Sequence, residues 1–120
     1  VGNSAVAQQL LGALQDTDSF VRRAAARTLG QIADKAIVPD LLELLDDEND
    51  AVRWATIESL GKIGDPDAIP ALVKKLQDAH KPALESKPMC DLAAEALQAI
   101  GTSEALAAIE RWRTGSTAPS

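Results

Sequence analysis

Two side chains are suited to nucleophilic or metal chemistry: the single histidine, His80, and the single cysteine, Cys90. An imidazole that takes the proton of a thiol forms a nucleophilic pair. Nothing in the sequence marks the oxyanion hole or the third orienting group that such a pair needs, so we expect no catalysis from it. A structural zinc site takes four ligands, usually Cys and His, and one of each cannot fill it.

The sequence also lacks a motif that holds phosphate or a cofactor. Four of its glycines are expected at the ends of helices rather than in a phosphate-binding loop: Gly30, Gly61, Gly64 and Gly101. We therefore expect no catalytic residues, no metal and no cofactor, and we predict a protein without enzymatic activity of its own.

Composition limits the kinds of partner that the chain can bind. It has 12 basic and 18 acidic residues, for a net charge of −6, and nucleic-acid affinity depends on clustered Lys and Arg. We therefore expect a protein partner and no nucleic acid. A lone cysteine is typical of a reducing compartment, and no apolar run approaches the roughly 20 residues of a membrane span. We expect a cytoplasmic protein that binds no membrane.

A repeated segment defines the elements that must position any site. Val21 to Gly30 reads VRRAAARTLG, and Val52 to Gly61 reads VRWATIESLG, 31 positions later. Eight positions recur at this one offset, which chance seldom produces. A third copy follows after 37 positions, because six residues are inserted within residues 79–88. Two prolines and the lack of apolar periodicity predict that this inserted segment is a loop.

Each repeat is predicted to be a pair of helices. From Val52 to Ile63, apolar residues follow the spacing of a buried helical stripe, and Gly64 is suited to the helix C-cap. Asp67 is predicted to cap the second helix, with Pro70 in its first turn. Neither helix can bury its stripe alone, so stacked repeats must cover it. We predict an all-α fold, an α-solenoid of stacked helical hairpins with about seven helices.

The sequence predicts one domain over residues 1–113 and a disordered tail over residues 114–120. The domain consists of a partial repeat and three full repeats, at residues 5–16, 17–47, 48–78 and 79–113. A solenoid that starts within a repeat leaves an apolar end uncovered. We therefore expect part of a longer protein, or a weak homo-oligomer that buries this end.

These repeats resemble the HEAT-like repeats named for phycobilisome lyases, whose units pair a VRxxAAxxLG helix with a shorter AIPxL helix. The resemblance is strongest in Val21 to Ile32, Ala51 to Leu76 and Asp91 to Gly101. It implies the solenoid fold, whereas such repeats occur in bilin lyase subunits and also in scaffolds without chemistry. The sequence has no paired His–Glu motif, so a metal-dependent hydroxylase built on such repeats is not expected.

One face of the first helices is predicted to bind a partner. At about 100° per residue, the arc that repeats between copies is predicted to face the core, and in the first copy it consists of Val21, Ala25, Ala26, Leu29 and Ile32. The opposite arc changes between copies, and stacking places its three versions side by side as a surface that we call the variable face. Its candidate partner-binding residues are Phe20, Arg23, Arg27, Trp54, Glu58, Asp91 and Glu95.

Aromatic residues beside arginine are enriched at the hot spots of protein interfaces, and in similar HEAT-like arrays this helix forms the concave, ligand-facing ridge. Structural alternatives exist for the aromatic residues. Phe20 would pack inward as a hydrophobic staple, and Trp54 would lie over Arg23 or Arg27 in a cation–π contact. Trp112 is predicted to cover the end of the core.

Two further arginines, Arg22 and Arg53, lie on the core side of their helices. We predict that they are structural and that their guanidinium groups bind loop carbonyls or a carboxylate such as Asp16 or Asp47. In the third copy Cys90 takes the place of this arginine.

Three functions follow from these residues. The first is a non-enzymatic scaffold that binds another protein through the variable face. The second, implied by the resemblance, is a subunit or fragment of a bilin lyase or of a phycobilisome-processing factor. The variable face would then hold a tetrapyrrole or a phycobiliprotein, with Arg23 and Arg27 pairing propionates. The third is the homo-oligomer that buries the open end of the solenoid. The inserted loop is expected to be either a recognition loop or a loop without a role.

Overall fold

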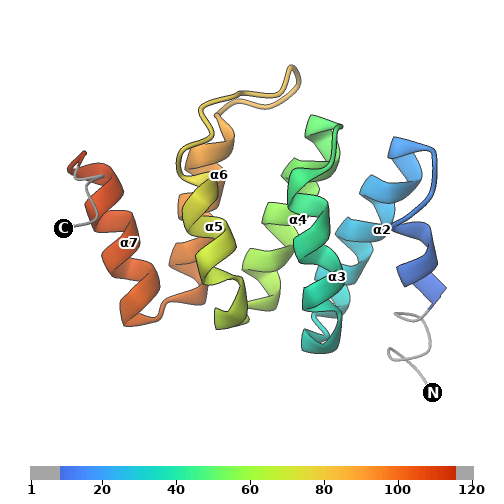
Figure 1. The fold of residues 1–120 in the computed structure, drawn as a ribbon, viewed down its shortest axis with the longest axis horizontal. Helices are drawn as coiled ribbons and strands as arrows, with labels where there is room; N and C mark the ends of the chain where they lie inside the picture. Colours follow the sequence, from blue (N-terminus) through green and yellow to red (C-terminus); the bar gives the residue numbers. More distant parts are fainter. Residues whose placement is uncertain (1–8, 116–120) are drawn as a thin grey trace.

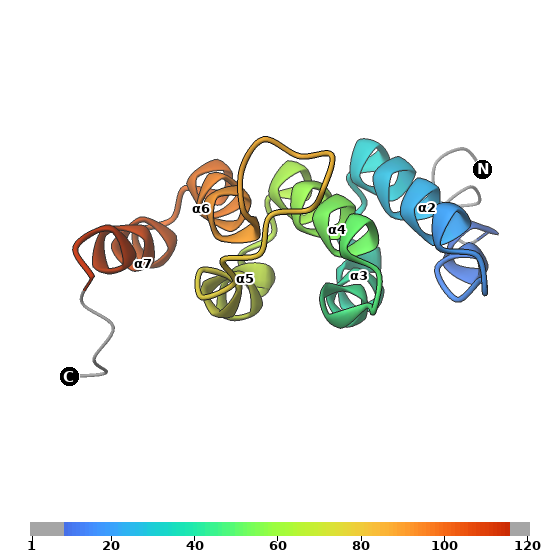
Figure 2. The ribbon, with the colours of Figure 1, turned by 90° about the horizontal axis from the view of Figure 1, so that it is seen from above.

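The structure, a computed structural model, describes residues 9–115, and all its regular elements in this range are helical, as predicted. One layer holds α2, α4 and α6, the other holds α3 and α5, and α7 lies at the end of the array (Figures 1 and 2). A helical segment at residues 9–13 precedes α2 (Ser19–Ile32), α3 (Val38–Glu43), α4 (Asp50–Ile63), α5 (Ile69–Lys75), α6 (Met89–Ile100) and α7 (Ser103–Arg113). Three 3-10 helices lie between them: η1 (Lys35–Ile37), η2 (Leu44–Asp46) and η3 (Pro66–Ala68).

The described part thus contains the seven helices that the sequence predicts, and the inserted segment at residues 79–88 is a loop. The start of the partial repeat, at residues 5–8, and residues 116–120 of the predicted tail lie outside the described residues.

A 3-10 turn leads into the second helix of each central repeat. Before α5 this turn is η3, and the Asp65 side chain accepts a hydrogen bond from the Asp67 N–H at 3.0 Å. The prediction that Asp67 caps the helix is therefore wrong, because the cap lies two residues earlier, where the 3-10 turn begins. Pro70 lies in the first turn of α5, as predicted.

The first helix of each repeat ends at a residue with left-handed backbone geometry. The angle φ is 58° at Ala33, 74° at Gly64 and 73° at Gly101. The N–H of each residue donates to a carbonyl of the preceding turn. Glycine adopts this geometry without strain, whereas Ala33 places a Cβ in a region that L-residues disfavour. The C-cap prediction for Gly64 is confirmed.

Two glycines in the last turns of α2 and α4 allow the first helices to pack closely. A Cβ at Gly30 would lie 2.8 Å from the Cα of Ser59, and a Cβ at Gly61 would lie 2.9 Å from the Cα of Ala96. Both distances are shorter than van der Waals contact, so only glycine permits this spacing of α2, α4 and α6. Across the first of these contacts, Ser59 Oγ donates to the Ala26 carbonyl at 2.6 Å.

The core lies between the layers and consists mainly of aliphatic residues. On the predicted core arc of α2, Ala25, Ala26 and Leu29 are buried. Val21 is 36% exposed, whereas Val52, its counterpart on α4, is fully buried. The prediction that Val21 faces the core is wrong, because among the described residues no earlier first helix packs against α2, whereas α4 packs against both α2 and α6.

Candidate functional site

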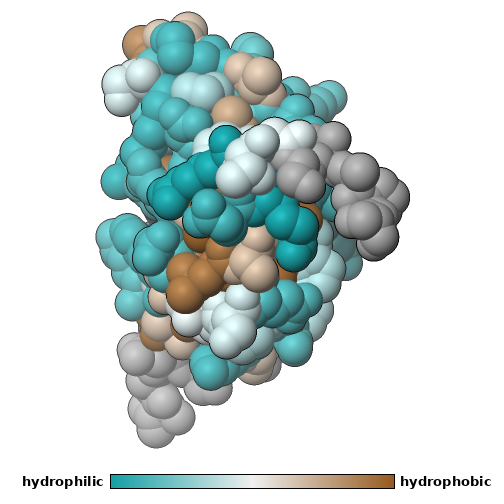
Figure 3. All heavy atoms as spheres, turned by 90° about the vertical axis from the view of Figure 1, so that its left-hand side faces the viewer, coloured by the Kyte–Doolittle hydropathy of each residue, from teal (hydrophilic) through white to brown (hydrophobic). Residues whose placement is uncertain are grey.

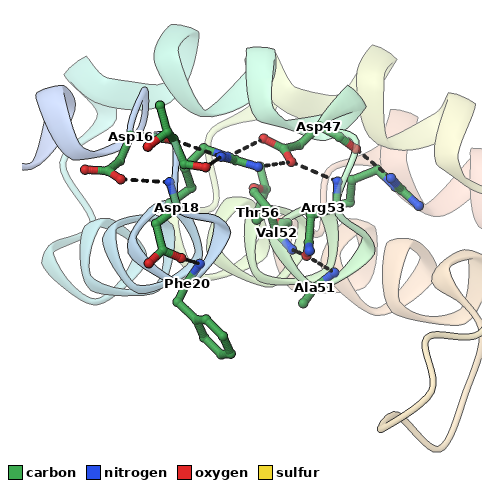
Figure 4. A network of polar contacts seen from close by, with 11 residues as sticks. Asp16, Asp18, Phe20, Asp47, Ala51, Val52, Arg53 and Thr56 are labelled. Carbon is green, nitrogen blue, oxygen red and sulfur yellow. Dashed lines mark hydrogen bonds and ion pairs between the residues drawn. The ribbon is translucent and has the colours of Figure 1, made fainter.

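A polar network joins successive repeats at the N-terminal ends of α2 and α4 (Figure 4). Arg22 Nη1 donates to the carbonyls of Asp16 and Thr17 at 2.8 and 3.2 Å. In the next repeat, Arg53 Nη1 donates to the carbonyl of Asp47. The Arg22 guanidinium also binds the Asp47 carboxylate. The prediction that both arginines bind loop carbonyls or an inter-helix carboxylate is confirmed, and their role is structural.

Asp47 lies at the centre of this network. Its Oδ1 accepts hydrogen bonds from Arg22 Nη2 at 3.0 Å and from the Asn49 N–H at 2.9 Å. Partial burial by itself raises the pKa of the Asp47 carboxyl group, but the hydrogen bonds from Arg22 and Asn49 and the nearby positive charges outweigh burial and lower that pKa. The folded state therefore favours the charged carboxylate.

In the third repeat Cys90 takes the place of this arginine, and a backbone hydrogen bond joins the helix to the preceding loop. The Cys90 backbone N–H donates to the Asp78 carbonyl at 2.8 Å. The thiol lies 3.7 Å from Asp91 Oδ1, and partial burial and the Asp91 charge raise the pKa of the Cys90 thiol. His80 Nε2 lies 2.9 Å from Asp50 Oδ2. Among the described residues the imidazole is bonded to Asp50 and the thiol to Asp91, and the two side chains are not hydrogen-bonded to each other.

On α2 the variable face is open to solvent. Phe20 is 76% exposed, and its ring points away from the helices (Figure 4). Asp18 caps α2 by accepting a hydrogen bond from the Phe20 N–H at 2.9 Å. The alternative of an inward-packed staple at Phe20 is therefore wrong. Arg23 is half-buried and Arg27 is exposed, and neither forms an ion pair with another described residue.

Trp54 does not project from the variable face. Its side chain is 8% exposed and belongs to the core, so the prediction that it is an exposed partner-binding residue is wrong. By helical angle, Trp54 on α4 corresponds to Arg23 on α2, but the two helices have different neighbours. Because α4 lies between α2 and α6, it has a narrower exposed arc than α2.

The acidic residues of the variable face line two separate hollows. Glu58 and Glu95 line one of about 180 Å³ between α4 and α6, and Asp91 and Glu95 line another of about 350 Å³ between α6 and α7. Glu95 forms an ion pair with Lys87 of the inserted loop. The predicted residues of the face therefore change from basic on α2 to acidic on α4 and α6. Lys62 lines the hollow of Glu58, Arg113 lines the hollow of Asp91, and Lys87 pairs with Glu95, so cations accompany each carboxylate.

A groove of about 340 Å³ lies at the N-terminal ends of α2 and α4. The inserted loop leaves the α5–α6 pair and reaches toward α4 (Figures 1 and 2), where it forms one wall of this groove. Of the predicted residues, the groove brings together Phe20 and Arg23. The rest of its lining is Ser19, Asn49, Asp50, Ala51, Pro82, Ala83, Leu84 and Glu85.

Sequence reasoning did not find that α4 and the loop contribute to this groove. The repeat offset locates the insertion, but the bond that joins its loop to α4 is between His80 and Asp50, which are far apart in sequence. The available signal was Leu84, a large apolar residue in a segment without helical periodicity. Leu84 is 98% exposed in the structure.

The end of the solenoid at α7 carries a hydrophobic area surrounded by hydrophilic residues (Figure 3). Leu106 of α7 is 41% exposed. Trp112 is half-buried and packs against the core, which confirms its predicted role at the core end. The opposite end, to which the predicted homo-oligomer refers, lies partly outside the described residues.

Within residues 9–115, no group of three or more His, Cys, Asp or Glu side chains is placed to hold a metal ion. In the same part of the chain, no helix has both the length and the apolar character that crossing a membrane requires.

Comparison with known proteins identifies the repeats. The family model described as HEAT repeats matches residues 2–87. A chain of the CpcE–CpcF complex of phycocyanin lyase from Nostoc sp. PCC7120 is 27% identical, with a TM-score of 0.72, over 96% of this chain and 54% of that one. Human deoxyhypusine hydroxylase, solved with glycerol, is 23% identical, with a TM-score of 0.60, over 95% of this chain and 35% of its own.

No curated protein matches the sequence. The chain spans 54% of the matched lyase chain and 35% of the hydroxylase. The resemblance to the HEAT-like repeats of phycobilisome lyases and the predicted α-solenoid are confirmed. The likeness to the hydroxylase concerns the fold alone.

Proposed function

Because this chain belongs to the HEAT-repeat family, we propose that it is a non-enzymatic scaffold that binds another protein through the variable face. Phe20 is the apolar contact, and Arg23 and Arg27 are the charged contacts. The observation that carries the proposal is the 76% exposure of Phe20 beside two arginines that form no ion pair with the described residues. Aromatic and arginine side chains dominate the binding energy of many interfaces.

The acidic residues of the same face set the orientation of the partner. Glu58 and Asp91 lie farther along the array than the arginines, so this part of the face offers carboxylates to the partner, beside the cations Lys62 and Arg113. Such complementarity contributes more to specificity and association rate than to affinity. Trp54 has no part in the proposed interface, because it is buried.

Affinity capture from a lysate of the source organism tests the scaffold. Wild type is compared with the double variant Phe20→Ala, Arg27→Glu, which removes the apolar contact and reverses one charge on α2. The expected result is a protein that wild type retains and that the variant loses, because the variant removes two contacts while leaving the core intact.

The matched control is the double variant Leu106→Ala, Lys74→Glu, which makes the same two kinds of change on α7 and α5. Both variants must unfold at the temperature of the wild type. Capture that is equal for the wild type and the α2 variant, or that the control variant loses equally, would move the interface away from the variable face.

A second candidate function is that of a subunit of a bilin lyase. It is supported by the match to a chain of a phycocyanin lyase complex, and this match covers nearly the whole of the present chain. In this function Arg23 and Arg27 pair the propionates of a tetrapyrrole. Both arginines are on α2, one helical turn apart, and are not bound to another described side chain.

Titration of a bilin with the purified protein tests this second function. Binding is expected to shift the bilin absorbance, and the double variant Arg23→Glu, Arg27→Glu is expected to abolish the shift. An unchanged spectrum with the wild type, or the same shift with the variant, contradicts it.

A further inference from the structure

The groove between α2 and the inserted loop has an exposed hydrophobic residue on each wall. Phe20 on α2 is 76% exposed, and Leu84 on the loop is 98% exposed. Ala51, Pro82 and Ala83 add further apolar lining. Exposed hydrophobic residues that gather around a concave surface mark interaction sites, whereas single ones are ordinary.

The loop wall is held by several contacts. His80 Nε2 bonds to Asp50 Oδ2 on α4 at 2.9 Å. At the base of the loop, the Met89 N–H donates to the His80 carbonyl and the Cys90 N–H donates to the Asp78 carbonyl, each at 2.8 Å.

Within the loop, Pro82 is buried, and Lys81 Nζ donates to the Glu85 carbonyl at 2.9 Å. The loop therefore presents Leu84 on a bonded framework, and a ligand need not order the loop to bind there. Preorganisation of this kind reduces the entropic cost of binding.

The two walls of the groove carry opposite charges. Arg23 lies on the α2 wall, and Arg27 follows one turn later on the same helix. Glu85 lies on the loop wall, and its carboxylate forms no ion pair with a described residue. The Asp50 carboxylate also lines the groove, but it is bonded to His80. A ligand that matches this pattern has an acidic group toward α2 and a basic group toward the loop.

We propose that this groove binds a short segment of a partner protein, in which one large apolar side chain lies between an acidic residue facing Arg23 and a basic residue facing Glu85. The apolar side chain enters between Phe20 and Leu84. The volume of about 340 Å³ is at the lower end of the roughly 300–1,000 Å³ of small-ligand pockets, which suits side chains of a segment. This inference rests on the proposed scaffold function and assigns its specificity to the loop.

Selection from a displayed library of random peptides on the full chain tests the inference. Enriched peptides are expected to combine one leucine or aromatic residue with an acidic and a basic residue. Leu84→Ser is expected to weaken their binding at least tenfold without changing the melting temperature, because Leu84 makes almost no contact with the fold. Leu106→Ser, on α7, is the matched control and is expected to leave binding unchanged.

Charge-reversal variants test which wall of the groove binds which charged residue of the peptide. Arg23→Glu is expected to weaken binding of the selected peptides. Replacing the acidic residue of these peptides by Lys is expected to restore their binding to that variant. Glu85→Lys is likewise expected to weaken binding, and replacing the basic residue of the peptides by an acidic one is expected to restore it. Peptides that bind Leu84→Ser and Arg23→Glu as tightly as they bind the wild type, or a library without any binder, would overturn the inference.

These failures are distinguishable from failure of the scaffold function. Peptides that bind elsewhere, or partners still captured in an α2-dependent manner, would leave the scaffold in place and remove only the groove. A second copy of the chain is another occupant of the groove. Dimers in sedimentation velocity that dissociate on Leu84→Ser would assign the groove to self-association and contradict the proposed partner segment.

Discussion

Arg22 and Asp47 connect two successive repeats through a two-point ion pair, with Arg22 Nε 2.9 Å from Oδ2 and Nη2 3.0 Å from Oδ1 of Asp47. Both side chains are largely buried. Arg22 also binds the carbonyl of Asp16, so one guanidinium holds the loop before its own helix and the loop before the next. Stacking in this solenoid therefore depends on polar contacts as well as on the apolar core.

The charge of Asp47 is expected to stabilise the fold in a pH-dependent manner. Because its pKa is lower in the folded chain than in the unfolded chain, its contribution is complete above the unfolded pKa and is lost as the pH falls through the folded pKa. Asp47→Asn is expected to lower the free energy of unfolding by on the order of 1 kcal/mol near neutral pH.

Urea unfolding at a series of pH values measures this effect. The difference between wild type and Asp47→Asn is expected to shrink as the pH falls below the ordinary carboxyl value of 3.8. Asp46→Asn is the control, because Asp46 is 88% exposed and pairs only with Lys75 at the surface. A difference that stays constant over this pH range would mean that the ion pair does not contribute through charge.

Gly30→Ala is expected to lower the free energy of unfolding by about 1–3 kcal/mol, because the new Cβ would overlap Ser59 and push α2 away from α4. The loss outweighs the better helix propensity of alanine, which is worth about 1 kcal/mol. Gly12→Ala is the matched control, since a Cβ there meets nothing within 4 Å. Equal effects of the two substitutions on thermal unfolding would show that close packing is not the reason for Gly30.

Ala33→Gly is expected to raise the stability by about 0.5–1 kcal/mol, because glycine relieves the left-handed strain at this C-cap. Gly64 and Gly101 already occupy the same position in the later repeats. The reverse change, Gly64→Ala, is expected to lower the stability by a similar amount. Thermal unfolding of both variants checks the prediction, and a lower melting temperature for Ala33→Gly would contradict it.

Phe20→Ala is expected to affect partner binding, whereas Trp54→Ala is expected to affect the stability of the fold. Truncating the exposed Phe20 is expected to change the free energy of unfolding by less than about 0.5 kcal/mol and to weaken binding of a captured partner by about 2 kcal/mol. Truncating the buried Trp54 is expected to reduce stability by about 3–5 kcal/mol.

Chemical unfolding together with partner titration separates the two effects. If Phe20→Ala unfolds as easily as Trp54→Ala, the ring has a structural role that its exposure does not reveal.

The sequence predicts those features that recur in every repeat. The buried stripe from Val52 to Ile63 and the C-cap at Gly64 follow from local spacing and backbone preference, and both are present. Trp54 was misplaced because a helical angle describes one helix, whereas burial depends on how many neighbours that helix has. The groove was not predicted for a related reason, since it is formed between α2, α4 and the inserted loop, which no repeat pattern relates.

The groove has a mechanical consequence. Its walls come from separate units of the array, with Phe20 on the first helix of one repeat and Leu84 on a loop that begins after the second helix of the next. The width of the groove is therefore set by the rotation between successive units. A ligand that holds both walls would fix the superhelical pitch, and a force that stretches or twists the array would alter affinity at this groove.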